Sequence, residues 1–234
     1  MTLGTEFWSA ISGAVVGGLI ALAIQLVAIR AAKNERTAAK METREVLAHS
    51  ILFKVTRINT NLFNLHLHLE ESFAAVDPSS HSDPCFFVRP LAGLPAHVHF
   101  SAEEMSLALS FKDPELTNKL ISLDVIHNYL IDIFEIYNGR RFDMLDNMPA
   151  EMDGNVGNFS FTEEEWMRVH PKIVVMNQLL ADARIRAKMD YDVSKKATVD
   201  LHKAINEKLE LKLEMEFKAE KLAALVEATK EPAE

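Results

Sequence analysis

The chain has 234 residues, with 25 Lys and Arg against 34 Asp and Glu, which gives a formal net charge of -9. Hydrophobic residues make up 48% of it, enough to bury a sizeable core, and the 8 Gly and 8 Pro exclude collagen-like and low-complexity chains. The acidic balance argues against general nucleic-acid binding, and the single cysteine, Cys85, excludes an intramolecular disulfide and a multi-cysteine zinc site.

The strongest pattern lies at the N-terminus, where a short segment 1–6 precedes residues 7–29, none of which is charged. A helix over 7–29 extends roughly 34 Å, which exceeds the hydrocarbon thickness of a bilayer, about 30 Å. Trp8 stands where an interfacial aromatic residue belongs. A cleaved signal peptide and a buried soluble helix fit less well, because the first needs preceding positive charge and the second a polar stripe. We predict a single transmembrane helix over 7–29.

The charges that flank residues 7–29 predict the orientation of this helix. Only Glu6 precedes it, whereas five cations follow it, namely Arg30, Lys33, Arg36, Lys40 and Arg44. The positive-inside rule therefore places residues 1–6 outside and everything after Arg30 in the cytoplasm, with the protein in the cell's inner membrane. The same five cations are expected to contact anionic lipid.

Small residues recur every four positions in the predicted membrane helix, at Ser9, Gly13, Gly17 and Ala21. Such a face lets two helix backbones approach closely, and Gly13 with Gly17 forms a GxxxG pair. The alternative is that glycine is simply common in membrane helices. The pattern favours self-association through this face into a homo-oligomer.

Residues 30–76 contain no Gly or Pro after Arg30 and predict a basic juxtamembrane helix that continues as a heptad helix. The apolar seam of that helix consists of Ala48, Ile51, Val55, Ile58, Leu62, Leu65 and Leu69. Its apolar face is wide, which favours a helical bundle over an isolated coiled coil. Residues 77–100 contain four prolines and are predicted to be a loop.

Helices are predicted again over 101–139 and 161–229, separated by a loop at 140–160 and followed by a tail at 230–234. Ser101 with Glu104, and Thr162 with Glu165, form capping boxes that mark helix starts. Gly139 is expected to end the first segment, and Pro171 to kink the second or to mark its true start. Two apolar faces support these helices: Leu116, Leu120, Leu123, Leu130, Phe134 and Tyr137, and Trp166, Val169, Ile173, Met176, Leu180 and Ala183.

These patterns predict an all-α fold. A single N-terminal transmembrane helix continues into a cytoplasmic bundle of long antiparallel helices with coiled-coil-like seams. Residues 161–229 form either a long helical hairpin or one kinked helix within that bundle.

Residues able to carry chemistry are few. His97 and His99 share a face only if their segment is extended, and no standard ligand partner stands beside them in sequence. Asp124 and His127 are one helical turn apart, but His127 falls on an apolar seam and is expected to be a hydrogen-bonded core residue. Cys85 is expected to be a small buried or surface residue rather than a nucleophile. We therefore predict no catalytic residue, cofactor or metal.

The function that fits best is a non-enzymatic interaction, scaffold or signalling module that is anchored in the lipid bilayer and binds a cytoplasmic protein. One alternative is an oligomeric, channel-like membrane effector, for which Ser9, Ser12 and Gln25 are the only polar side chains within 7–29. A weaker alternative is a helical-bundle metal protein or enzyme that uses His97, His99, Asp124 or His127.

Overall fold

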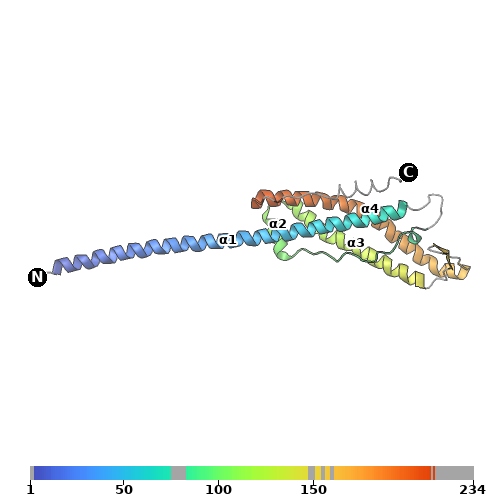
Figure 1. Ribbon diagram of the computed structural model, residues 1–234, viewed down its shortest axis with the longest axis horizontal. Helices are drawn as coiled ribbons and strands as arrows, with labels where there is room; N and C mark the ends of the chain where they lie inside the picture. The colour runs from blue at the N-terminus through green and yellow to red at the C-terminus, as the bar shows by residue number, and fades with distance from the viewer. Residues whose placement is uncertain are drawn as a thin grey trace. The chain divides into compact units, whose positions relative to one another are not determined.

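The structure is a computed structural model that describes residues 3–74, 83–146, 151–153, 156–158, 161–211 and 213. Its elements in chain order are α1 (Leu3–Ala74), the 3-10 helix η1 (Pro84–Phe86), α2 (Ala102–Ser110), α3 (Pro114–Asp146), β1 (Glu151–Asp153), β2 (Val156–Asn158) and α4 (Glu163–Leu209) (Figure 1). The two strands form a short antiparallel hairpin. Apart from this hairpin the regular secondary structure of the described residues is helical, which confirms the prediction of an all-α fold.

Contacts divide the chain into two compact units, Met1–Leu47 and Ala48–Glu234. The first unit contains the N-terminal part of α1, where every described side chain from Val16 to Thr43 is exposed. The second unit contains the remainder of α1 and all other elements. It has a hydrophobic core of its own.

The core of the second unit lies between three long helices, α1, α3 and α4. All seven seam residues predicted between Ala48 and Leu69 are at most 2% exposed. The predicted apolar face of α3 is buried as well, and so is the α4 seam from Ile173 to Ala183, whereas Trp166 is 39% exposed and Val169 is partly buried. The periodicity of apolar residues therefore identified the faces that the bundle buries.

Contacts between α1 and α3 establish that these two helices run in the same direction. Asn61 Nδ2 lies 3.0 Å from His127 Nε2, and one to two turns further along both helices the rings of His68 and Phe134 lie 6.3 Å apart. The expectation of a uniformly antiparallel bundle is therefore wrong for this pair. A parallel pair needs a connection long enough to return along the bundle, and about forty residues separate α1 from α3.

Helix α4 runs opposite to both of its neighbours. Asn59 near the start of the bundle part of α1 contacts Ser194, whereas Glu70 near its end contacts Arg184. The order along α4 is thus reversed relative to α1, as it also is relative to α3. The short hairpin β1–β2 lies between α3 and α4 in the chain.

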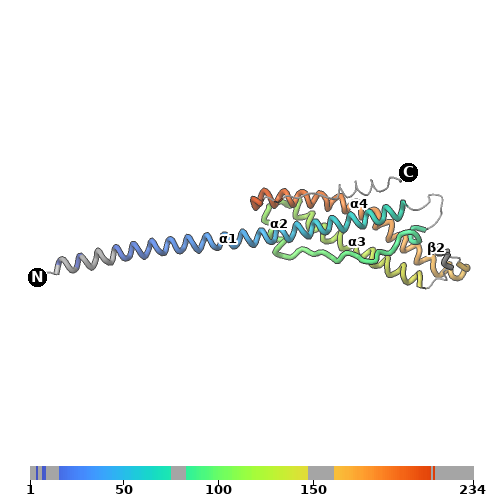
Figure 2. Tube along the Cα trace, in the orientation of Figure 1, coloured from blue at the N-terminus to red at the C-terminus, as the bar shows by residue number. Residues whose placement is uncertain are grey.

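The segment 88–100, here called the strap, explains the parallel pair. It returns along the bundle without helical structure, as Figure 2 shows, and α2 and α3 follow it. Its start contacts the end of α1, because His68 Nε2 lies 3.0 Å from the Arg89 carbonyl oxygen. Its end contacts an earlier turn of α1, where Lys54 donates to the His99 carbonyl oxygen at 2.8 Å.

Helix α3 continues past Gly139 to Asp146, although the sequence pattern predicts an end at this glycine. Arg141 and Met144 beyond it are buried. A Cβ placed on Gly139 would meet no atom within 4 Å, so no packing constraint requires glycine there. Burial of the following turn therefore outweighs the low helix propensity of one glycine, about 1 kcal/mol.

Helix α4 begins at its predicted capping box and contains Pro171 inside its third turn, so this proline does not mark its start. The helix ends at Leu209, because Glu210 adopts a left-handed conformation with φ 54°. The Leu213 N–H then donates to Asn206 Oδ1 at 3.0 Å, and Asn206 Nδ2 donates to the Leu213 carbonyl oxygen at 3.1 Å. The helix predicted to extend to residue 229 is thus interrupted at Glu210, and residues 214–234 lie outside the described residues.

Candidate functional site

The first unit presents apolar side chains to its surroundings. The exposed ones are Phe7, Trp8, Val16, Leu19, Ile20, Leu22, Ile24, Leu26, Val27 and Ile29, with exposed fractions from 49% to 68%. This N-terminal helix is long and apolar enough to cross a membrane, judged by its length and composition. A helix that is apolar on all sides needs an apolar environment around it.

The predicted lipid-contacting cations follow directly after this apolar stretch. The side chains of Arg30, Lys33, Arg36 and Lys40 are exposed, and that of Arg44 is partly buried. At 100° per residue these five positions fall within one third of the helix circumference. The cations therefore form one basic face, which is suited to an anionic surface.

The predicted small-residue face lies on the same helix. Gly17 and Ala21 are exposed, and a Cβ placed on Gly17 would meet no atom within 4 Å. Ser9 and Gly13 belong to helical backbone, but their side-chain positions lie outside the described part of the structure. The described half of this face is thus open to close approach by another helix. Of the three polar residues considered for a channel, Gln25 is exposed, and the side chains of Ser9 and Ser12 lie outside the described part of the structure.

Two of the histidines considered as metal ligands lie on the strap and face α3. His99 Nδ1 lies 2.9 Å from Asp124 Oδ1, and His97 Nε2 lies 3.0 Å from Asp132 Oδ1. Each imidazole ring therefore contacts a carboxylate of its own, and the two ring centroids are 6.2 Å apart. Within the described residues, no three His, Cys, Asp or Glu side chains are grouped in a way that could hold a metal ion. One hydrogen bond, between His99 and Asp124, and one close imidazole–carboxylate contact, between His97 and Asp132, thus connect the strap to α3.

His127 does not join Asp124, with which it was paired in sequence. It is 0% exposed, and its two ring nitrogens lie 3.0 Å from Asn61 Nδ2 and 2.9 Å from Asn128 Oδ1. Burial lowers the pKa of His127, and this outweighs the opposing effect of its hydrogen bond with Asn128, so the ring is neutral at pH 7. The expectation of a hydrogen-bonded core histidine is confirmed.

Cys85 is fully buried in η1. Burial raises the pKa of its thiol to about 12, and the nearby Arg141 offsets this only in part. The reactive form of cysteine is the thiolate, which is scarce at neutral pH when the pKa is so high. The structure therefore gives Cys85 the properties of a small core residue.

Sequence reasoning missed two asparagines that bind the strap through its main chain. Asn138 accepts the Leu91 N–H at 3.2 Å and donates to the Leu91 carbonyl oxygen at 3.0 Å. Asn128 makes the same pair of bonds to Val98, both at 3.0 Å. The available signal was their position, since each directly follows a residue of the buried α3 face.

A second missed cluster connects α1 to α2. Glu104 is 2% exposed and accepts hydrogen bonds from Ser50 Oγ at 2.5 Å, Lys54 Nζ at 2.7 Å and the Ser101 N–H at 2.6 Å. Burial acts to raise the pKa of Glu104, but the hydrogen bonds from Lys54 and Ser50 outweigh it and hold the pKa below its ordinary value. The capping box that sequence analysis detected therefore also carries a partly buried ion pair, in which the carboxylate is the buried member.

No protein-family model matches the sequence, and no curated protein or solved structure is detectably similar to it.

Proposed function

We propose that this protein is anchored in a membrane by residues 7–29 and presents its helical bundle as a non-enzymatic interaction module. The observation that carries the proposal is the contrast between the two units. In the first, apolar side chains are exposed along the described part of the helix, whereas the second buries its own apolar seams. The apolar side chains exposed along the first unit support a lipid environment around it, which removes this apolar surface from water.

The orientation that we propose places residues 1–6 outside and the bundle in the cytoplasm, at the inner membrane of the cell. It rests on the basic face between Arg30 and Arg44. A fluorescent reporter at the C-terminus that is protected from protease in intact cells supports this orientation. Digestion of the reporter from outside, or recovery of the full chain in the soluble fraction after lysis, refutes it.

Self-association through the small-residue face is the second part of the proposal. Gly13→Leu and Gly17→Leu place bulky side chains on this face and should abolish cross-linked dimers in detergent. Gly18→Leu is the matched control, because Gly18 lies about 100° away around the helix and its surroundings are equally open. Dimers that survive both face substitutions, or that Gly18→Leu removes equally, contradict this interface.

Exposed apolar residues on the bundle support its role in binding a cytoplasmic protein. Val125, Tyr129 and Ile136 are spaced like one face of α3, and they are 65%, 44% and 49% exposed. Apolar groups exposed at such spacing are typical of helix-binding surfaces. Affinity capture of the membrane-extracted protein, compared with Val125→Lys, tests this role. Proteins that both forms capture equally are not bound by this face.

A further inference from the structure

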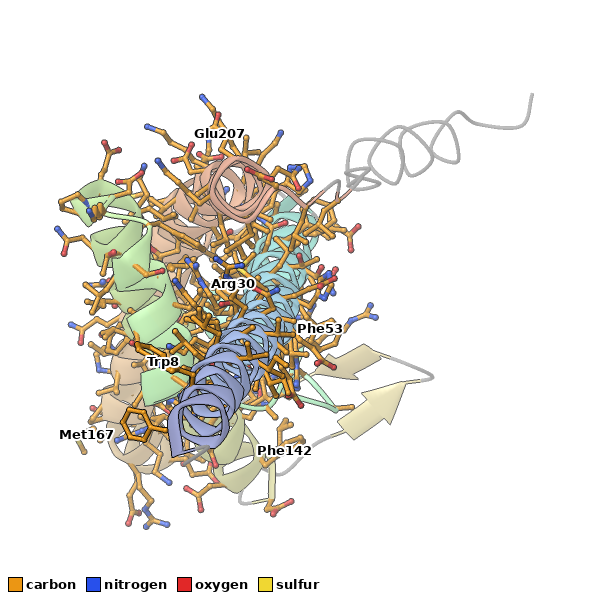
Figure 3. All side chains as sticks on the ribbon, turned by 90° about the vertical axis from the view of Figure 1, so that its left-hand side faces the viewer. Trp8, Arg30, Phe53, Phe142, Met167 and Glu207 are labelled. Carbon is orange, nitrogen blue, oxygen red and sulfur yellow. The ribbon has the colours of Figure 1, made fainter. Side chains whose placement is uncertain are left out.

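The second unit has a polar cavity of about 550 Å³ at the end where α2 turns into α3 and where α4 finishes. Figure 3 views the bundle from this end, with Glu207 labelled on the last turns of α4. The volume falls within the range of small-molecule sites, about 300–1,000 Å³. All of its lining residues belong to the unit Ala48–Glu234, and none belongs to the proposed membrane helix.

Ionic side chains dominate the cavity lining. The lysines are Lys112, Lys119, Lys196, Lys203 and Lys208, and the acids are Asp113, Glu115, Asp200 and Glu207. With all of them ionised, the lining has one more positive than negative charge. The first turn of α3 also lines the cavity, and the positive end of its helix dipole adds to this excess.

The carboxylates of the lining already have partners. Lys119 lies 2.6 Å from Glu115 and 2.8 Å from Asp200, and these bonds raise its pKa. Asp113 Oδ1 accepts the Leu116 N–H at 3.0 Å. Lys119 offsets one of the two carboxylate charges that it contacts, and Asp113 is used as a helix cap, so these three acids oppose an incoming anion less than their number suggests.

The remaining lysines have ammonium groups available for a ligand. Lys196 is 4.0 Å from Glu115 and Lys203 is 3.9 Å from Glu207, which are the longest ion-pair distances in this group. Within the described residues, the ammonium groups of Lys112 and Lys208 have no hydrogen-bond or ion-pair partner. Lys112 lies in the turn between α2 and α3 with φ 57°, and Lys208 in the last turn of α4. Separate elements thus bring cations to one cavity.

We propose that this cavity binds a phosphomonoester. Such a group carries up to two negative charges and three acceptor oxygens, which suits several convergent ammonium groups. A monocarboxylate has only two acceptor oxygens and one charge, and is expected to bind fewer of these ammonium groups. The chemistry is the same for a small soluble phosphomonoester and for a lipid with a phosphomonoester headgroup, so the test must separate these two sources.

The experiment uses the full-length protein in detergent and titrates it with glycerol 3-phosphate by calorimetry at constant ionic strength, with acetate as the comparison anion. A parallel titration uses nanodiscs of phosphatidylcholine with or without phosphatidic acid, whose headgroup is the same phosphomonoester. Lys112→Gln combined with Lys208→Gln removes the two unpartnered cations. Lys188→Gln, an exposed lysine on α4 outside the cavity, is the matched control.

We expect saturable binding of glycerol 3-phosphate that is at least tenfold tighter than that of acetate. It should weaken at least tenfold in the double variant and remain unchanged in Lys188→Gln, with the thermal midpoint of all variants preserved. A tenfold loss seen only with phosphatidic acid nanodiscs also supports the site and identifies lipid as the source. Absence of saturable binding to either probe overturns the proposal. Equal losses in the double variant and in Lys188→Gln overturn it as well.

Discussion

Glu104 offers the sharpest test of how the bundle is stabilised, because its buried carboxylate connects α2, to which it belongs, with α1 and with the residue before α2. It binds Ser50 and Lys54 of α1 and the main chain at Ser101, directly before α2. Glu104→Ala removes this acceptor entirely. Glu104→Gln keeps the shape of the side chain but removes its charge.

The size of the expected effect follows from the burial of the two partners. Removing one member of a buried ion pair costs about 3–5 kcal/mol in stability, since the other charge loses its partner. The side chain of Lys54 is 29% exposed and keeps its bond to the His99 carbonyl oxygen, which favours the lower end of that range. We expect Glu104→Ala to cost about 3 kcal/mol. Glu104→Gln should cost about 1–2 kcal/mol, because an amide oxygen still accepts hydrogen bonds.

The pKa of Glu104 adds a pH dependence of defined sign. Its pKa is held below its ordinary value of 4.5 in the folded protein. A carboxyl with a lowered folded-state pKa contributes stability that is fully present above its unfolded value and is lost as the pH falls through the folded value. The stability difference between the native protein and Glu104→Gln should therefore be constant near neutral pH and shrink below about pH 4.5.

Hydrogen exchange measured by mass spectrometry on the full-length protein in detergent reports this contact locally, in peptides that cover 48–60 and 101–110. Both peptides should lose protection in Glu104→Ala. Glu103→Ala is the matched control, because Glu103 is exposed and occupies the same helical turn. If Glu104→Ala and Glu103→Ala exchange alike, the assigned ion pair does not stabilise the bundle. The same conclusion follows if the stability difference between the native protein and Glu104→Gln grows as the pH falls.

Three further predictions concern the core, the strap and the cysteine. Leu62 is 0% exposed, so Leu62→Ala leaves a cavity in the bundle core and should lower the free energy of unfolding by about 2–5 kcal/mol, measured by urea titration. Phe53→Ala, at a 70% exposed position, should change the free energy of unfolding little. Asn138→Ala leaves the Leu91 main chain without its two bonds, so exchange in strap peptides should accelerate while α4 peptides keep their protection. Cys85 should react with a thiol reagent at pH 8 only after unfolding, because its thiol is buried and has a pKa of about 12; rapid labelling of the folded protein contradicts that assignment.

Local signals in the sequence predicted the helix starts and the buried faces. The capping boxes at Ser101 and Thr162 are both present in the structure. The seam from Ala48 to Leu69 is buried throughout. These features depend on residues within one or two helical turns of each other, so periodicity and capping chemistry are enough to locate them.

Helix ends and residue roles were predicted less well. Helix α3 passes through Gly139, and α4 ends at Leu209 with Glu210 rather than a glycine after it, because tertiary contacts decide whether a further helical turn is stable. Asp124 contacts His99 of the strap rather than His127, its neighbour in sequence. That partner lies 25 residues away and no local pattern indicates it.

The sequence by itself therefore determined that the fold is helical, where the capped helices start, which faces are apolar and that one N-terminal stretch is apolar enough for a bilayer. Only the tertiary structure decided that α1 and α3 run in parallel, that the strap lies along them, and that lysines from separate elements line one cavity. The physical reason is the range of the interactions. Helix formation and amphipathicity are set within a few residues, whereas chain direction and side-chain partners depend on contacts between segments far apart in the chain.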